Sequence, residues 1–446
     1  MINEAILSAA ENFLPRKIEH DIRKALIKKG IIILLGSRQV GKTSIMYRLI
    51  HYLLNKKEKD VPPSQIIYID LEFPRVLSEI DGLYGDEFIN WLRAKGVNTD
   101  DDSFIFIDEI HYLKNPSSFL KTLHDHYPGL KLIVSGSSSL MIKHKFKDTL
   151  AGRKQVFEIN PLDFEEFLTF KDSPLAERKK QIDLRTIIEN KKLPDMKELK
   201  YLIPEFTTNF DEFAVFGGYP GVVLKQPVED KIYLLADIYS SYIRKDIKDF
   251  AQINNVSAFN RLIELLTYQI GGMVNLSELT NSLNISRQTI ENYLFLLENT
   301  YVLSLLPPYY TNRRKEIVKS PKVFFHDNGI RNSIVRNFDT LDKRMDKGAL
   351  FENAVFSELH KHINVLETLH FHRTKTKIEV DFVIKSKNII PIEVKYRPFK
   401  KTIMPSGLRS FIKDYNPETA YVVTKDFFGE TVFENTDVLF IPGWVL

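Results

Sequence analysis

The sequence predicts an α/β protein with a parallel sheet near its N-terminus, a helical middle and a second α/β region at its C-terminal end. Three observations predict this fold class. An apolar strand runs into a glycine-rich loop and a helix at 31–54. Strands and helices alternate up to about residue 165, which is typical of a parallel sheet. Two short strands follow a helix between residues 348 and 397.

Length and composition indicate a globular chain of several domains. Its 446 residues exceed one ordinary domain, and 43% of them are apolar and 27% charged. The net charge of +4 is too small to argue for nucleic acid. The lack of cysteine excludes disulfides and thiolate zinc sites, and it fits a reducing cytoplasm. Because we find no secretory signal and no apolar run long enough to span a bilayer, we expect a cytoplasmic protein without a membrane partner.

The first element is a phosphate-binding loop. A buried strand is predicted at 31–35, and residues 36–44 read GSRQVGKTS. This is the GxxxxGK[ST] pattern between a strand and a helix, whose backbone N–H groups converge on phosphate oxygens. We expect Lys42 to reach the β- and γ-phosphates of ATP and Thr43 to bind Mg²⁺. The expected ATP-binding residues are Gly36, Ser37, Arg38, Gln39, Val40, Gly41, Lys42, Thr43 and Ser44.

An acidic pair ends a later strand of the same predicted sheet. Residues 104–107 form an apolar strand, and Asp108 and Glu109 follow directly. An acid at the carboxyl end of a parallel strand beside the phosphate loop can hold Mg²⁺ through water. We therefore expect Asp108 to bind the metal and the nucleotide, and Glu109 to orient and activate the attacking water. The alternative is an ordinary solvated strand end.

Two further candidates lie close to this sheet in the sequence. The strand at 131–139 ends in hydroxyl groups, and Ser137, like Ser135 and Ser138, can contact the γ-phosphate or the attacking water. The alternative is an N-cap for the next helix. Arg153, in the segment TLAGR, is a candidate arginine finger for the nucleotide of a neighbouring subunit, which would make the protein a homo-oligomer. The alternative is an arginine in a glycine turn before the next strand.

These signatures resemble those of the AAA-type P-loop ATPases. The acidic pair lies on a strand separate from the phosphate loop, and a strand with a polar end follows it. The segments TLAGR and NPLDFEEFL resemble one bacterial and archaeal branch of these proteins, in which an AAA-type module precedes a C-terminal domain of unknown function. The resemblance covers about residues 15 to 446, and it implies ATP hydrolysis.

The middle of the chain resembles a winged helix-turn-helix. Helices are predicted within NLSELTNSL (275–283), with Asn275 or Ser277 as N-cap, and at 287–300. The turn NIS lies between them, and the wing strand YVLSLL follows. The first turn of the second helix offers side chains that can contact phosphates and base edges, and these are Ser286, Arg287, Gln288 and Thr289. We expect double-stranded DNA as a partner. The alternative is a winged helix that contacts protein.

Two other segments of the middle region carry smaller predictions. Residues 213–223, FAVFGGYPGVV, predict a turn with a structural role. A basic stretch follows the wing, where one acid stands against five bases for a net charge of +4: Arg313, Arg314, Lys315, Lys319 and Lys322. This stretch can form a strip beside DNA, or it can be a solvated loop.

The C-terminal region carries two carboxylates and a lysine on two short strands. Residues 378–397 read IEVDFVIKSKNIIPIEVKYR, and the period of two places Glu393 and Lys395 on one face. If the strands pair as a hairpin, Asp381 reaches that face too. The carboxylates can hold Mg²⁺, which polarises a phosphate and lowers the pKa of a bound water. Lys395 can orient that water or stabilise the transition state.

This D…ExK arrangement resembles the restriction-endonuclease-like superfamily, written PD-(D/E)XK. The acid that many members carry on an upstream helix corresponds to Glu352, in LFENAV, as a further metal ligand. The resemblance implies metal-dependent DNA cleavage at Asp381, Glu393 and Lys395. Two alternatives are an ordinary charged strand surface and a nuclease-like fold kept for binding only, in an ATP-switched DNA- or protein-binding regulator.

We therefore predict four parts. These are an AAA-type ATPase domain at 1–165, a helical lid or linker at 166–229, a winged helix-turn-helix at 230–312 and a nuclease-like domain at 313–446. In this hypothesis, ATP hydrolysis regulates or drives DNA cleavage.

Overall fold

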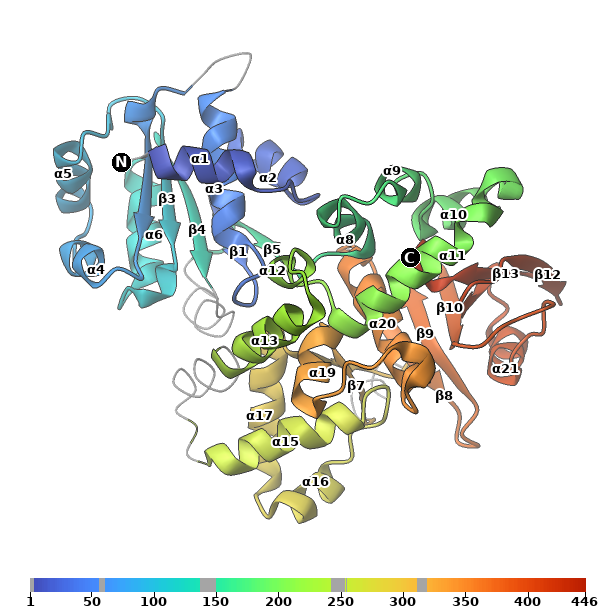
Figure 1. The fold of residues 1–446 in the computed structure, drawn as a ribbon. Helices are drawn as coiled ribbons and strands as arrows, with labels where there is room; N and C mark the ends of the chain where they lie inside the picture. Colours follow the sequence, from blue (N-terminus) through green and yellow to red (C-terminus); the bar gives the residue numbers. More distant parts are fainter. Residues whose placement is uncertain (1–3, 56–60, 137–149, 242–252, 254, 311–318) are drawn as a thin grey trace. The chain divides into compact units, whose positions relative to one another are not determined.

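The computed structural model describes residues 4–55, 61–136, 150–241, 253, 255–310 and 319–446 (Figure 1). The chain divides into two compact units, Met1–Asn160 and Pro161–Leu446. The finer boundaries predicted inside the second unit stay predictions. No helix within the described ranges has both the length and the apolar character needed to cross a bilayer.

The first unit contains a five-stranded parallel sheet in the order β2-β3-β4-β1-β5. All residues of β1 are buried, because helices cover both faces of a parallel sheet and its strands are then continuous apolar runs. The parallel sheet predicted from the sequence is confirmed. Its strands are β1 (Ile31–Leu35), β2 (Ile66–Asp70), β3 (Ser103–Asp108), β4 (Leu130–Gly136) and β5 (Lys154–Glu158).

Helices connect these strands, as expected for a doubly wound sheet. The helix that follows the phosphate loop begins at Lys42, directly after Gly41 in a left-handed conformation. The helices of the first unit are α1 (Glu4–Asn12), α2 (Glu19–Leu26), α3 (Lys42–Leu54), α4 (Pro74–Ile80), α5 (Asp86–Ala94) and α6 (Pro116–His126).

The second unit begins with a helical region that ends at the predicted glycine turn. Gly217 has φ +74°, and a Cβ there would lie 2.2 Å from Asp327 Oδ1. The N–H of Gly218 donates to Asp327 Oδ2 at 2.7 Å. The two glycines therefore make room for a buried carboxylate, which is a structural role. The helices are α8 (Phe164–Phe170), α9 (Leu175–Lys179), α10 (Leu184–Asn190), α11 (Met196–Phe216), α12 (Pro220–Val223) and α13 (Val228–Ile238).

The helix pair predicted in the middle region is present. Asn275 caps one helix and Ser286 caps the next, each by accepting backbone N–H groups. Two antiparallel strands follow. These elements are α15 (Val256–Tyr268), α16 (Leu276–Leu283), α17 (Arg287–Asn299), β6 (Leu303–Leu306) and β7 (Lys322–Phe325).

The sequence of residues 322–335 indicates a strand followed by a turn, and the predicted turn is wrong, because a helix, α19 (Asn328–Val335), begins there. Asp327 is its N-cap and accepts the N–H of Ile330 at 3.1 Å. A capping aspartate offsets the turn tendency of the Asn-Gly pair that follows it.

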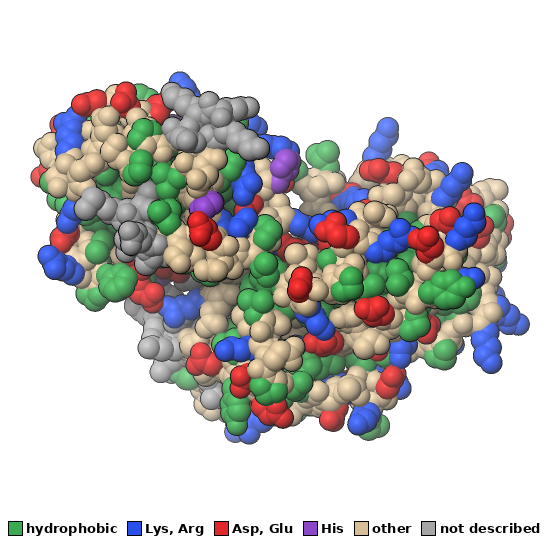
Figure 2. Space-filling view, turned by 45° about the horizontal axis from the view of Figure 1, so that its top comes forward, with side chains coloured by type: hydrophobic (Ala, Val, Ile, Leu, Met, Phe, Trp, Pro, Cys, Tyr) green, Lys and Arg blue, Asp and Glu red, His purple; other side chains and the backbone are tan. Residues whose placement is uncertain are grey.

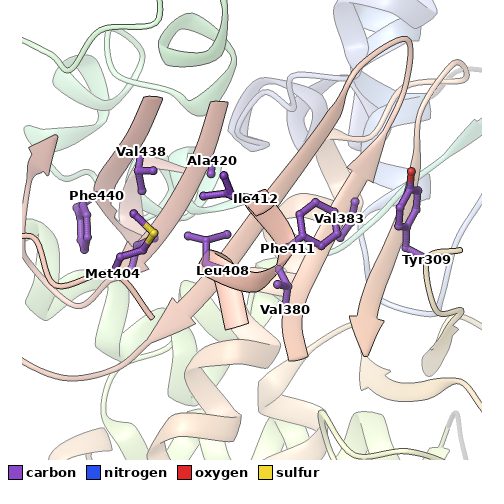
Figure 3. Close-up of a cluster of buried hydrophobic side chains, with 11 residues drawn as sticks. Tyr309, Val380, Val383, Met404, Leu408, Phe411, Ile412, Ala420, Val438 and Phe440 are labelled. Carbon is purple, nitrogen blue, oxygen red and sulfur yellow. The ribbon is translucent and has the colours of Figure 1, made fainter. Parts of the chain in front are cut away.

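The C-terminal part is a mixed six-stranded sheet in the order β12-β13-β11-β10-β9-β8. Helix α21 (Ser406–Tyr415) packs on it: in Figure 3, Leu408, Phe411 and Ile412 face strand residues such as Val383 and Val438. Helix α20 (Lys347–His362) packs against β7 and β10. The strands are β8 (Thr368–Arg373), β9 (Glu379–Lys385), β10 (Ile389–Lys395), β11 (Thr419–Thr424), β12 (Gly429–Phe433) and β13 (Thr436–Pro442).

Candidate functional sites: the phosphate loop and the carboxylate–lysine cluster

The phosphate loop lies at the carboxyl end of β1. A Cβ at Gly36 would lie 2.3 Å from the carbonyl oxygen of Ile159, so only glycine fits there. Lys42 Nζ donates to the carbonyl oxygens of Gly36 at 3.1 Å and of Ser37 at 2.9 Å. Burial lowers the pKa of Lys42 below its ordinary value. The lysine thus folds over the loop that is expected to hold the phosphates.

Asp108 is the polar centre beside this loop. Its Oδ2 accepts hydrogen bonds from the Thr43 hydroxyl at 2.7 Å and from the Tyr68 hydroxyl at 2.8 Å. Its Oδ1 accepts one from the Ser135 hydroxyl. The three donors come from α3, β2 and β4, whose ends meet because β2, β3 and β4 are parallel neighbours. The contact between Thr43 and Asp108 joins the two residues predicted to serve the magnesium ion.

Glu109 adopts the left-handed conformation, with φ 54° and ψ 49°. Its N–H donates to Ser135 Oγ at 3.0 Å, and its Oε2 lies 3.0 Å from His111 Nδ1. Such a conformation is uncommon for a residue with a side chain and concentrates at functional sites. Ser137, the predicted contact to the γ-phosphate, lies outside the described residues. Ser135, weighed beside it, contacts both acids of the pair.

Arg153 lies at the opposite end of this sheet from the phosphate loop. Ile31 of β1 pairs with Lys154 of β5, so Arg153 comes just before the amino end of both strands. The loop follows the carboxyl end of β1, about 16 Å away at the rise of an extended strand. The Arg153 Nε lies 2.7 Å from Asp125 Oδ1. Arg153 therefore does not reach the phosphate loop of its own chain.

The sequence predictions missed two residues at the ATP site, Tyr68 and Arg16. Arg16 donates from Nη1 to the carbonyl oxygen of Val40 and from Nη2 to that of Asn160, both at 2.9 Å. Glu19 accepts from the Arg16 N–H at 2.8 Å and from Arg48 Nε at 2.7 Å. Arg16 thus links the loop to the last residue of the first unit. No local pattern signals this role, since the partners lie far apart in the sequence.

The second site lies on the hairpin of β9 and β10. The strands are antiparallel, with Phe382 opposite Ile392. Asp381 Oδ2 accepts the N–H of Val394 at 2.7 Å. Lys395 Nζ lies 2.7 Å from Glu393 Oε1 and 3.6 Å from Asp381 Oδ2. The predicted hairpin and its shared face are therefore present.

Helix α20 and strand β7 add two residues to this cluster. Lys322 Nζ lies 3.4 Å from Glu352 Oε1 and 2.5 Å from Glu379 Oε1. The placement of Lys322 in a basic strip beside DNA is wrong, because the residue is only 2% exposed. The Lys322 side chain is buried together with the apolar residues of β7, and its ammonium group pairs with the carboxylates of Glu352 and Glu379. Lys319 is exposed, whereas Arg313, Arg314 and Lys315 lie outside the described residues.

Burial and like charge shape the electrostatics of this carboxylate–lysine cluster, defined here as Lys322, Glu352, Glu379, Asp381, Glu393 and Lys395. Burial, reinforced by the nearby Asp381 carboxylate, raises the pKa of both Glu352 and Glu393. Burial alone would lower the pKa of Lys395, but Asp381 and Glu393 raise it above its ordinary value. The lysines therefore stay charged and offset part of the carboxylate repulsion.

The cluster fits a divalent cation in its chemistry. Carboxylate oxygens are the ligands that Mg²⁺ prefers, and Glu393 Oε2 is buried without a hydrogen-bond partner. As the side chains stand, however, no three acidic or histidine side chains in the described part of the chain are arranged to hold a metal ion. Lys395 lies between Asp381 and Glu393, so an ion would have to displace its ammonium group.

The surface of the molecule carries mixed charge. In the view of Figure 2, basic and acidic side chains are interspersed over the described residues. This agrees with the small net charge of the chain.

Comparisons with known proteins identify the class of the first unit. Residues 28–168 match the family model of an AAA domain. Residues 207–341 match a domain of unknown function, DUF8612, and residues 347–442 match another, DUF4143. The chain therefore carries an AAA-type P-loop ATPase domain, the class that its sheet and phosphate loop define, followed by regions of these two domain families.

Relatives that align with most of this chain occur in archaea and bacteria. An uncharacterized protein of Methanocaldococcus jannaschii is 28% identical over 402 residues, which cover 89% of this chain and 81% of the relative. One of Haemophilus influenzae is 22% identical, over 93% of this chain and 94% of the relative. The Walker-type ATPase of Pyrococcus abyssi aligns with 73% of this chain and 97% of its own at 14% identity, with a TM-score of 0.43, which is too low to carry a structural conclusion.

Proposed function

We propose that this protein hydrolyses ATP in its first unit and cleaves double-stranded DNA at the carboxylate–lysine cluster, in a metal-dependent reaction that ATP regulates. The AAA domain supports the hydrolase part. One observation carries the cleavage part: Asp381, Glu393 and Lys395 converge with Glu352, and a buried oxygen of Glu393 has no partner.

The ATPase roles follow from the contacts at the phosphate loop. Mg²⁺ bound together with ATP would offset the charge on the β- and γ-phosphates. Lys42 binds those phosphates after leaving the carbonyl oxygens of Gly36 and Ser37. Thr43 and Asp108, which already share a hydrogen bond, face the metal. Glu109 orients the attacking water, since its backbone is fixed by Ser135.

The cleavage roles follow from the carboxylate–lysine cluster. Asp381 and Glu393 would hold a divalent ion, and Glu352 would complete the acidic set. Such an ion would polarise the scissile phosphate and lower the pKa of a bound water. Lys395 leaves its carboxylate partners and donates to the water or to the developing charge on the phosphate.

Helix α17 supports DNA as the substrate. Its first turn exposes Arg287, whose Nε donates to Glu291 of the same helix, and Gln288, whose side-chain amide donates to Asn292. Such residues suit phosphate and base contacts. We expect replacing both with alanine to weaken duplex binding at least about tenfold in fluorescence anisotropy. Arg261→Ala, an exposed position on α15, is the matched control.

Arg153 is proposed to act on the nucleotide of a neighbouring subunit, which requires a homo-oligomer. Its place at the far end of the sheet from its own loop supports action in trans. We expect Arg153→Ala and Lys42→Ala each to lose ATP turnover, and a mixture of the two to regain part of it. The mixture contains sites that have an intact loop and an intact arginine from the partner. Unchanged turnover in Arg153→Ala would remove this role.

A plasmid-nicking assay with Mn²⁺ tests the cleavage. The native protein is expected to nick supercoiled DNA, and Asp381→Ala to leave it intact while keeping its ATPase activity. Asp339→Ala, an exposed aspartate of the same unit, is the control and is expected to nick normally. Nicking that survives in Asp381→Ala would contradict the proposal.

A second candidate function is an ATP-switched regulator that binds DNA or protein without cleaving. The observation that favours it is the pairing of the carboxylates with lysines in the cluster. It predicts duplex binding that depends on Arg287, with no nicking under any metal condition.

A further inference from the structure

Lys322 enters the carboxylate–lysine cluster from outside the hairpin that carries the D…ExK residues. It lies on β7, whereas the hairpin is formed by β9 and β10. Its ammonium group lies 2.5 Å from Glu379 Oε1, 3.4 Å from Glu352 Oε1 and 5.4 Å from the centre of the Phe371 ring. Because only 2% of the residue is exposed, the charge of Lys322 interacts with the carboxylates of the cluster rather than with solvent.

The backbone around Lys322 is held on both sides. β7 pairs with β6, and Lys322 forms an isolated bridge to Met273. The N–H of Val323 donates to the carbonyl oxygen of Gly272 at 3.1 Å. The turn that contains Gly271 and Gly272 also packs closely against the Glu352 carboxylate, because a Cβ at Gly271 would lie 3.2 Å from Glu352 Oε1. The lysine is therefore fixed beside Glu352 by the strand that supplies it.

The formal charges favour a single added ion. Four carboxylates stand against Lys322, Lys395 and Arg373, which lies 3.4 Å from Glu379 Oε2, and this leaves one negative charge. One divalent ion then gives a net charge of +1, which a phosphodiester group balances. Two divalent ions would give +3 in a largely buried site, and uncompensated buried charge is costly. The four carboxylates in this count are those of Glu352, Glu379, Asp381 and Glu393.

We propose that the charged side chain of Lys322 replaces a second metal ion at the proposed phosphodiester-cleaving site. The site would therefore bind one divalent ion, whereas two-metal enzymes bind two. Lys322 covers the side of Glu352 and Glu379. The ion would be held by Asp381 and by Glu393, whose Oε2 has no hydrogen-bond partner, once Lys395 has left its place between them. The inference rests on the proposed cleavage function. It also means that the site needs both regions that match domains of unknown function, because Lys322 lies in residues 207–341 and the acids lie in residues 347–442.

Counting bound Mn²⁺ on the full chain without nucleotide tests this assignment. The count is made by electron paramagnetic resonance of free Mn²⁺ at saturation, and ions at this site are those lost when Asp381→Ala is introduced. We expect one such ion in the native protein and two in Lys322→Met, which frees Glu352 and leaves Glu379 with Arg373 alone. Two ions in the native protein, or one ion in Lys322→Met, would overturn the inference.

Two further variants keep the result interpretable. Lys322→Gln removes the charge and keeps an N–H donor for Glu379, so it is used if Lys322→Met does not fold, with the same expected count of two. Lys413→Met, at an exposed lysine of α21, is expected to keep one ion. If the native protein and Asp381→Ala bind equal numbers of ions, the proposed metal site itself fails. If Asp381 matters and both Lys322 variants stay at one ion, only the role of Lys322 fails.

Discussion

Ser135 is the side chain that joins the two acids of the ATPase site. Its hydroxyl donates to Asp108 Oδ1 and accepts the N–H of Glu109 at 3.0 Å. We expect Ser135→Ala to lower ATP turnover about tenfold and to leave nucleotide affinity unchanged, because it unties Glu109 and leaves a partly buried N–H without its partner. Steady-state hydrolysis and nucleotide titration measure the two effects.

The control for this prediction is Ser78→Ala. Its hydroxyl donates to a backbone oxygen on an exposed helix of the same unit, so its loss should change neither quantity. Full turnover in Ser135→Ala would show that Glu109 holds its conformation without the hydroxyl.

Asp211 gives the second unit a dependence on pH. Burial raises its pKa from 3.8 to about 6, although Lys425 and Tyr396 lower it. The folded protein therefore keeps this proton up to about pH 6, while the unfolded chain releases it near pH 4. The resulting stability is present below pH 4 and is lost as the pH rises through 6.

Replacing Asp211 with asparagine should flatten this loss. Between pH 4 and pH 7, the free energy of unfolding of native protein is expected to fall by on the order of 1 kcal/mol more than that of Asp211→Asn. Chemical denaturation at the two pH values measures the difference. Asp339→Asn, at an exposed position, should behave as the native protein does. Parallel curves for Asp211→Asn and native protein would contradict the assignment.

At the residue scale, the sequence predicts the site residues that belong to local patterns. Lys42, Thr43 and Asp108 follow from the phosphate loop and the strand that ends in acids. Arg16 and Tyr68 do not, because their partners lie 24 and 40 residues away. The sequence places Lys322 in a basic strip or a solvated loop, and this is wrong for the same reason: its partners lie far away in the sequence. Its basic sequence neighbours suggest solvent, whereas its partner Glu352 lies 30 residues further along the chain.

At the scale of the elements, the glycine turn after α11 allows a specific prediction about stability. Gly217→Ala should destabilise the second unit by about 2 kcal/mol or more, since it combines a left-handed residue with a clash against Asp327. Gly348→Ala is the matched control. A Cβ meets nothing within 4 Å there, so alanine in helix α20 should be neutral or slightly stabilising. Thermal unfolding compares them, and equal melting temperatures would contradict the packing role of the turn.

Element types follow from the sequence more readily than their pairing. Strand β1 is a continuous apolar run, and the capped helices α16 and α17 carry clear start signals. The order of the C-terminal sheet depends on contacts between distant strands, which no local pattern encodes. Helix α19 was predicted as a turn because the Asn-Gly pair outweighed the capping aspartate before it.

At the scale of the whole molecule, the chain itself connects the two proposed sites. Arg16 ties Val40 of the phosphate loop to Asn160, where the first unit ends. In the second unit, the N–H of Phe164 donates to Glu358 of α20 at 2.9 Å. The same helix carries Glu352 of the cluster. A shift of the loop on nucleotide binding would thus reach α20 along the backbone from Asn160 to Phe164 and then through the hydrogen bond to Glu358.

Glu358→Gln should weaken this route. The amide loses the charge that faces both the Phe164 N–H and Lys361, which lies 3.0 Å from Glu358 Oε1. We expect nicking to respond to ATP at least about threefold less, while ATP turnover stays unchanged. Glu205→Gln, at an exposed site on α11, is the control. A full ATP response in Glu358→Gln would rule out this contact as the link.

The most direct test of the whole account measures Asp381-dependent plasmid nicking with nucleotide as the only variable. Nicking by the native protein should change severalfold when ATP is added, and nicking by Lys42→Ala should not change. The two sites would then act as one regulated enzyme. Nicking that needs Asp381 and is the same with ATP, without ATP and in Lys42→Ala would contradict ATP control, and an absence of nicking would favour the binding regulator.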